Sequence, residues 1–174
     1  MRAVEELTNN KFLNIKNVID PDMGVKGYQF AERMGIDSVA FVCYDPKHGF
    51  LLNSEYKPPI DSFILGAFGG SLDKEKSHKE IVIDEVREEA GFEVDIEAIH
   101  YVGKALVSTQ MNQFCMLFLV MVDKDKQKER QPENEIEALA STTWIKSTDS
   151  IYNLADWKPI TIISKAICQE VINV

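Results

Sequence analysis

The sequence predicts a single domain that mixes β-strands with helices, an α/β protein. Two short apolar runs rich in β-branched and aromatic residues, at 38–44 and 114–122, have the length and composition of buried strands. A third segment, residues 77–90, repeats apolar residues with helical spacing and begins with a capping sequence. A chain of 174 residues is long enough for one domain with a proper core.

Composition limits the classes of partner. The apolar fraction of 45% and the charged fraction of 27% are those of a soluble globular protein. The net charge of -9 argues against a nucleic-acid backbone or an anionic membrane as the partner. It does not exclude a small phosphate substrate, because a bound cation reverses the local field.

The cysteines and the first residues predict a cytoplasmic location. Cys43, Cys115 and Cys168 are widely spaced and include no CxxC pair, which favours free and mostly buried thiols in a reducing compartment. Residues 1–10 lack the long apolar core of a signal peptide. The longest apolar run, residues 114–122, is too short to span a bilayer.

The first elements are expected to form a hairpin. We expect residues 1–10 to be a loose or helical lead-in. Residues 12–18 alternate as a strand should, residues 20–24 have turn chemistry, and residues 27–34 can return as a second strand.

The strands continue towards a pair of glycines. The strand at 38–44 is followed by a turn, and residues 50–54 pair back on it. The prolines of residues 56–59 forbid a central strand there. Residues 61–68 are expected to form a strand that leads into the glycine pair at 69–70.

The helix at 77–90 carries signals at both ends. Ser77 is a good N-cap, Glu80 completes a capping box, and Gly91 lies where a left-handed C-cap is expected. The apolar stripe of this helix consists of Val82, Ile83, Val86 and Ala90.

Three carboxylates on the adjoining helical face suggest a bound cation. Glu85, Glu88 and Glu89 are spaced at i, i+3 and i+4, so their charges repel one another. A hard divalent cation with oxygen ligands would offset this repulsion. A solvated acidic face is the alternative, and the spacing alone does not decide between the two.

Further strands and helices are expected after this helix. Residues 96–107 and 114–122 are predicted strands, with a polar loop at 108–113 between them. A short helix is expected at 147–154. Pro159 can begin a final helix, because proline is tolerated at the first helical position. The apolar stripe of that helix consists of Ile160, Ile163, Ile167 and Val171.

An acidic segment, residues 123–137, is expected to be an exposed loop. It is charged throughout and contains Pro132. A solvated charge run is the plain interpretation of any one of its carboxylates. Its glutamates are Glu129, Glu133, Glu135 and Glu137.

The stretch from the glycine pair to Phe92 resembles the Nudix box. That pattern is Gly, five residues, Glu, seven residues, then Arg-Glu-U-x-Glu-Glu-x-Gly-U, where U is aliphatic or aromatic. Lys76 stands where the box has its first Glu, and Asp84 stands where it has Arg. We expect these two side chains to form the usual contact with reversed polarity. The matching residues are Gly70, Glu85, Val86, Glu88, Glu89, Gly91 and Phe92.

The resemblance implies the Nudix fold, an α/β/α sandwich with a mixed sheet and a loop-helix-loop box. It covers residues 37–174 as the core of a single domain, and residues 140–145 resemble the last strand of the family. Residues 1–36 would be an N-terminal extension with a hairpin, similar to the one that packs on the partner subunit in homodimers of the ADP-ribose pyrophosphatase branch. An ordinary edge hairpin on its own domain is the alternative.

The resemblance also implies the site. The cofactor would be Mg²⁺ or Mn²⁺, bound by the backbone carbonyl of Gly69 and by three catalytic carboxylates. Glu135 is expected to be the general base, with Glu133 in reserve. Tyr56 and Lys57, in a tyrosine-basic-proline segment similar to one in ADP-ribose pyrophosphatases, are expected to bind substrate together with Gly70. The three carboxylates are those of Glu85, Glu88 and Glu89.

The implied reaction is metal-dependent hydrolysis of the pyrophosphate bond of a nucleoside diphosphate derivative, with ADP-ribose or a nucleotide sugar as the expected substrate. The products would be a nucleoside monophosphate and a second phosphate. Two alternatives are open. Lys76 and Asp84 suggest a Nudix-fold nucleotide-binding module with weak or no turnover. A structural domain, with the acidic helix as part of its surface, is the other.

Overall fold

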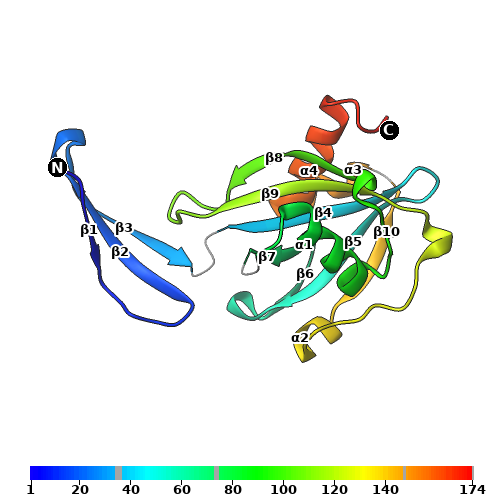
Figure 1. Cartoon of the computed structure of the whole chain (residues 1–174), viewed down its shortest axis with the longest axis horizontal. Helices are drawn as coiled ribbons and strands as arrows, with labels where there is room; N and C mark the ends of the chain where they lie inside the picture. The colour runs from blue at the N-terminus through cyan, green and yellow to red at the C-terminus, as the bar shows by residue number, and fades with distance from the viewer. Residues whose placement is uncertain (34–36, 73–74, 147, 174) are drawn as a thin grey trace.

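A computed structural model describes residues 1–33, 37–72, 75–146 and 148–173. In this part of the chain two sheets form, and the larger one is covered by helices (Figure 1). The predicted α/β/α sandwich with a mixed sheet is confirmed.

A small antiparallel sheet forms at the N-terminus, in the order β1-β2-β3. It consists of β1 (Ala3–Glu6), β2 (Leu13–Asp20) and β3 (Val25–Arg33). The predicted hairpin is therefore observed, although position 34 lies outside the described residues. The expectation of a loose or helical lead-in was wrong, because residues 3–6 pair with residues 16–19 of β2. That pairing supplies hydrogen bonds that no local pattern could reveal.

The large sheet has seven strands, with the path β10-β5-β4-β9-β8; β6 pairs with β5 and β7 pairs with β4. The central pair, β4 and β9, is parallel, and the other pairs are antiparallel. The strands are β4 (Ser38–Asp45), β5 (Gly49–Lys57), β6 (Ser62–Gly66), β7 (Phe68–Ser71), β8 (Ile99–Leu106), β9 (Phe114–Met121) and β10 (Ser141–Ile145).

The strand expected at 61–68 is divided in two. Its first part, β6, pairs with β5, whereas β7 pairs with β4. Ala67 lies at the change of partner, and its backbone N–H donates to Asp156 Oδ2 at 3.1 Å. The Asp156 carboxylate thus accepts the hydrogen bond of an N–H group that has no acceptor on either neighbouring strand.

The helices mostly follow the predicted positions. They are α1 (His78–Glu85) with a π-helical continuation at Val86–Ala90, α2 (Glu135–Ala138), α3 (Thr148–Ile151) and α4 (Trp157–Cys168). Short 3₁₀ turns occur at Pro21–Met23, Pro58–Ile60, Ile96–Ala98 and Lys124–Lys126.

Three expectations about these elements need correction. The acidic segment is not all loop, since it contains a 3₁₀ turn and the start of α2. The final helix begins before Pro159, which is its third residue, a position where a backbone N–H has no intrahelical partner. The strand expected from residue 96 begins at Ile99, after a 3₁₀ turn. The short helix expected at 147–154 is α3, and position 147 lies outside the described residues.

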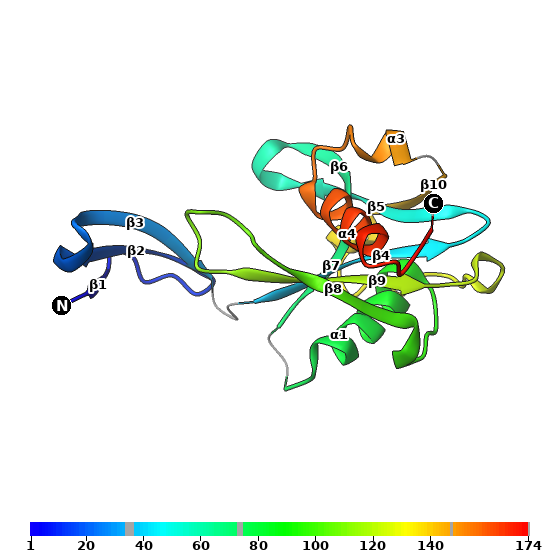
Figure 2. The same cartoon turned by 90° about the horizontal axis from the view of Figure 1, so that it is seen from above.

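The sheet separates two hydrophobic cores. Alternate residues of β4 face opposite sides: Phe41 and Cys43 pack towards α1, whereas Val42 and Tyr44 pack towards α4. Figure 2 shows α1 and α4 on the two sides of the sheet. No helix in the described part of the chain is both long enough and apolar enough to cross a membrane.

Candidate active site

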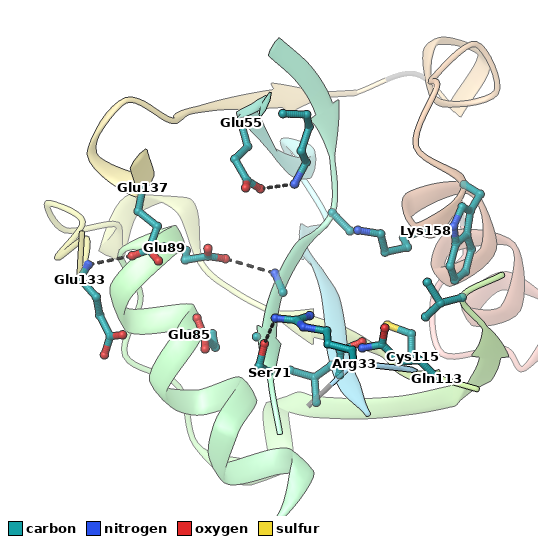
Figure 3. A pocket seen from close by; sticks show the side chains of 18 residues that line it. Arg33, Glu55, Ser71, Glu85, Glu89, Gln113, Cys115, Glu133, Glu137 and Lys158 are labelled. Atoms are coloured by element: carbon teal, nitrogen blue, oxygen red, sulfur yellow. Dashed lines mark hydrogen bonds and ion pairs between the residues drawn. The ribbon is translucent and has the colours of Figure 1, made fainter. Parts of the chain in front are cut away.

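A cavity of about 460 Å³ lies beside β7, between the box helix and the start of α4 (Figure 3). Carboxylates from three parts of the chain gather on one side of it. Glu85 and Glu89 come from the box helix, Glu55 from β5, and Glu133 and Glu137 from the acidic segment.

The box helix begins as its sequence predicts. Ser77 Oγ accepts a hydrogen bond from the backbone N–H of Glu80 at 3.3 Å, and the Glu80 carboxylate accepts one from the N–H of Ser77 at 2.8 Å. Val82 and Val86 are fully buried under the sheet. The capping box and the buried stripe fix which face of the helix is turned towards the cavity.

A π turn at Val86–Ala90 changes the direction of the last carboxylates. Gly91, in the left-handed conformation predicted for a C-cap, donates its N–H to the carbonyl of Val86. A π turn advances by roughly 85° per residue rather than roughly 100°, so Glu88 lies about 105° from Glu85 instead of about 60°. Glu89 stays within about 20° of Glu85. The helix therefore presents Glu85 and Glu89 to the cavity, and Glu88 is not among the described residues that line it.

The Glu88 carboxylate has another partner. Its Oε1 accepts a hydrogen bond from the Arg87 guanidinium at 2.9 Å. Arg87 also lies 3.6 Å from Asp84 Oδ1. Lys76 Nζ donates to the other oxygen of Asp84, Oδ2, and this hydrogen bond raises the pKa of Lys76. The expected contact with reversed polarity is therefore present, and Arg87 joins Glu88 to it.

The glycine pair allows the helix to come close. A Cβ on Gly70 would lie 2.2 Å from Glu85 Oε1, so only glycine leaves room for that carboxylate. The backbone N–H of Gly69 donates to Glu89 Oε2 at 3.2 Å. Both glycines line the cavity.

The site suits a cation with oxygen ligands. Burial, followed by the charge of Glu85, raises the pKa of Glu89 to about 8, although the bond from Gly69 acts in the opposite direction. A divalent cation would relieve this excess of negative charge. No three acidic, histidine or cysteine side chains of the described residues are arranged to hold a metal by themselves. Mg²⁺ needs no such cage, because it is commonly held by one or two carboxylates with water and substrate oxygens.

The acidic segment reaches the cavity through Glu133, the residue held in reserve, and not through Glu135. Glu133 and Glu137 line it, whereas Glu135 is not among the described lining residues. The Glu137 carboxylate accepts from the backbone N–H of Glu133 at 2.8 Å, and Asn134 Oδ1 accepts from the N–H of Glu137 at 3.0 Å. The Asn134 side chain thus helps to start α2 as an N-cap, which the sequence analysis did not foresee.

The two residues expected to bind substrate on β5 separate. Lys57 lines the cavity and forms an ion pair with Glu55 at 2.7 Å. The Tyr56 hydroxyl instead donates to Asp61 Oδ1 at 2.6 Å, and Tyr56 is not among the described lining residues. Neighbouring strand residues point to opposite faces, which explains the difference.

Sequence reasoning missed the other side of the cavity. It is lined by Arg33 at the end of β3, Gln113 just before β9, and Trp157 and Lys158 at the start of α4. These residues come from segments far apart in the chain, and no local motif marked them.

Comparisons with known proteins agree with this fold. No family model matches the chain. An uncharacterized Nudix hydrolase from Schizosaccharomyces pombe is 23% identical over 124 residues, which are 65% of this chain and 58% of that relative. The match therefore spans less than two thirds of the relative's length. A crystal structure of an ADP compounds hydrolase superposes with a TM-score of 0.74 at 15% identity, over 97% of this chain and 90% of that one.

The fold and the loop-helix-loop site define a chain with the Nudix fold. The resemblance to the Nudix hydrolases that the box indicated is confirmed by the curated relative and by the structural neighbour.

Proposed function

We propose that the protein hydrolyses the pyrophosphate bond of a nucleoside diphosphate derivative in a metal-dependent reaction. ADP-ribose and nucleotide sugars are the first substrates to test. One observation carries the proposal: Glu85 and Glu89 meet the glycine pair at the wall of one cavity. The curated Nudix relative and the ADP compounds hydrolase support it.

The cofactor in this proposal is Mg²⁺ or Mn²⁺. Glu85 and Glu89 would hold it, and the carbonyl of Gly69 and the carboxylate of Glu88 are the further donors that the box implies. When bound, such a cation neutralises phosphate charge and lowers the pKa of a coordinated water.

The protein groups around the cavity have separate tasks in this reaction. Gly69 and Gly70 line the cavity, and their backbone would contact the substrate. Lys57 adds positive charge at the rim, and Tyr56 keeps β5 in place through Asp61. A carboxylate of the acidic segment accepts the proton of the attacking water. Glu133 and Glu137 line the cavity, which supports this role for one of them, and Glu135 lies between them in sequence.

We also propose that the protein is a cytoplasmic homodimer. The small sheet exposes apolar side chains, among them Val4, Leu13 and Tyr28, which are 50%, 46% and 47% exposed. A partner subunit would cover them. All three cysteines are free, which suits a reducing compartment. Sedimentation velocity on the full chain tests the assembly, and a monomer at micromolar concentration would refute it.

A nucleotide-binding module with weak or no turnover is the second candidate. The observation that favours it is the Glu88 carboxylate, which pairs with Arg87 and does not line the cavity. A site with only two helix carboxylates would keep nucleotide affinity more easily than full turnover.

The decisive experiment is a hydrolysis screen over nucleotide sugars, dinucleotides and nucleoside triphosphates, with Mg²⁺, Mn²⁺ or chelator. Glu85→Gln and Glu89→Gln should each lower kcat by about a hundredfold or more with the fold intact, because each removes a cation ligand. Glu80→Gln is the control on the same helix, since its carboxylate only caps the N-terminus. Nucleotide binding without hydrolysis under any metal would instead select the binding module.

A further inference from the structure

The cavity has opposite charge on its two sides. Figure 3 shows Glu85, Glu89, Glu133 and Glu137 on one side and Arg33, Gln113 and Lys158 on the other. The second side belongs to no part of the Nudix box, so the proposed hydrolysis leaves its chemistry unexplained.

Arg33 is held at the cavity by the small sheet. Its strand, β3, is fastened to the loop before β9: the N–H of Ala31 donates to the carbonyl of Gln110 at 2.7 Å, and the Asn112 amide donates to Glu32 at 2.7 Å. The guanidinium itself donates to Ser71 Oγ at 2.8 Å. Within the described residues it has no acidic partner, which is unusual in a chain with a net charge of -9.

Lys158 is held from the opposite direction by α4. Asp156 caps this helix by accepting from the N–H of Lys158 at 3.1 Å and also accepts from the N–H of Ala67. A Cβ on Gly66 would lie 2.3 Å from Asp156 Oδ2, so the contact is close. The ammonium of Lys158 lies 3.5 Å from Asp156 and points into the cavity (Figure 3).

Gln113 supplies an amide that no described residue uses and that opens on the cavity. Gln113 is only 4% exposed. Its backbone carbonyl accepts a hydrogen bond from the N–H of Val107 at 3.0 Å, which fixes the position of Gln113 before β9. Its side chain lines the cavity and makes no hydrogen bond to any described residue. Because it opens on the cavity, the amide is free to hydrogen-bond to a ligand or to water there.

Donors greatly outnumber acceptors on this side. Arg33 has five N–H donors and uses one, Lys158 has three, one of which can face Asp156, and the Gln113 amide has two. The side-chain acceptors are the Gln113 carbonyl and the hydroxyls of Ser38 and Ser71, of which Ser71 already accepts from Arg33. A donor-rich surface with two cations is complementary to an anion with several acceptor oxygens.

We propose that Arg33, Gln113 and Lys158 form a subsite for one phosphoryl group of the substrate's diphosphate, the group turned away from the carboxylates. The identity of this ligand rests on the proposed function. The small sheet, in addition to any contact with a partner, thereby supplies a substrate-binding residue to the cavity of its own chain.

The test is direct binding of α,β-methylene ADP, a diphosphate that the proposed reaction cannot cleave, by calorimetry in the presence of Mg²⁺. Arg33→Gln and Lys158→Gln should each weaken binding about tenfold, because each removes a charge-assisted hydrogen bond. Arg33→Lys should recover part of the loss. Lys26→Gln, which removes a charge from the same strand outside the cavity, should bind as the wild type does.

Adenosine and inorganic phosphate distinguish what the subsite recognises. Adenosine has no phosphoryl group, so it should bind equally well to the wild type and to all variants. If the glutamine variants weaken adenosine binding as much as they weaken binding of α,β-methylene ADP, the subsite recognises the nucleoside and the proposal is overturned. If Arg33→Gln and Lys158→Gln weaken the binding of inorganic phosphate but not that of α,β-methylene ADP, the subsite does not bind the substrate's diphosphate and the proposal is overturned. Unchanged binding of α,β-methylene ADP in both glutamine variants would also refute it.

The outcome is separable from that of the proposed hydrolysis. If the wild type cleaves a nucleoside diphosphate derivative but the variants bind α,β-methylene ADP normally, the subsite is wrong and the activity stands. If the wild type cleaves nothing but binding depends on Arg33 and Lys158 as expected, the subsite stands and the hydrolysis fails.

Discussion

The carboxylate of Glu85 occupies the space in which a side chain at position 70 would lie. The box pattern has a glycine at this position, but the pattern does not give the reason. The structure supplies it, because the contact is between a backbone position on β7 and a helix residue that approaches it in the folded chain.

Gly70→Ala should therefore abolish most of the activity. The new methyl group would meet Glu85 Oε1 at 2.2 Å and Cδ at 2.7 Å, so the carboxylate must shift from the position in which it faces the cavity. We expect kcat/KM to fall by about a hundredfold or more. Gly27→Ala is the matched control, since its nearest neighbour would be Asn17 Oδ1 at 3.4 Å. Full activity in Gly70→Ala would show that Glu85 has no role at this wall.

Asp45 gives the fold a pH dependence of known sign. Burial alone would raise its pKa, but N–H donors from Lys124, Lys47 and His48, together with the His48 ring, lower it to about 2. Since the folded pKa lies below the unfolded one, the stabilisation is present above pH 4 and is lost as the pH falls towards 2.

Asp45→Asn should lower the free energy of unfolding by about 1–2 kcal/mol at pH 7, because the variant loses the negative charge that the N–H donors stabilise. Urea unfolding at pH 7 and pH 3 measures the change, which should shrink at pH 3. Asp22→Asn, at a side chain that is 79% exposed, is the control. A difference that grows at low pH would contradict the assignment.

At the level of elements, the sequence predicted best what depends on neighbouring residues. The capping box at Ser77 and the left-handed Gly91 follow from local chemistry, and both were found. The π turn was not predictable, because Val82, Val86 and Ala90 fit ordinary helical spacing. The position of the π turn depends on the acidic segment, because the N–H groups of Lys128 and Gln131 donate to the carbonyls of Gly91 and Glu88.

The contact between Lys76 and Asp84 joins the box loop to the box helix, and a double-mutant cycle measures it. Lys76→Glu or Asp84→Arg alone places like charges together, and each should lower kcat/KM by roughly two- to fivefold, since exposed pairs are weak. The double reversal should recover most of the loss.

Arg87 complicates the second variant, because it lies 3.6 Å from Asp84 and would face a new arginine. The cycle should therefore be repeated in Arg87→Gln, where recovery should be more complete. Strictly additive effects in both backgrounds would show that the pair has no energetic coupling.

At the level of the whole molecule, the cavity is assembled from segments that are distant in sequence. Glu85 and Glu89 could be predicted because a short motif contains them. Arg33, Gln113 and Lys158 could not, since they meet only after β3, β9 and α4 have docked. The pairing of β1 with β2 was missed for the same reason, because no pattern within residues 3–6 requires it.

Cation binding should stabilise the entire fold. A cation that binds the native state at about a hundred times its Kd adds about 2.7 kcal/mol, which for a chain of this size corresponds to a rise in Tm of roughly 5–10 °C. Differential scanning fluorimetry with Mg²⁺, Mn²⁺ or chelator measures it. Glu89→Gln should lose the rise and Glu80→Gln should keep it. An unchanged Tm at millimolar metal would count against the cation site.

The acidic segment is fastened to the box helix by its backbone. Lys128 donates its N–H to the carbonyl of Gly91 at 2.7 Å, and Gln131 donates its N–H to the carbonyl of Glu88 at 2.9 Å. In hydrogen–deuterium exchange these two amides should resist deuteration, although they lie in a highly charged stretch. They should open together with the amide of Phe92 as one cooperative unit. The glutamates of the box helix and those of the acidic segment would then become disordered, and regain their places, in a single kinetic event.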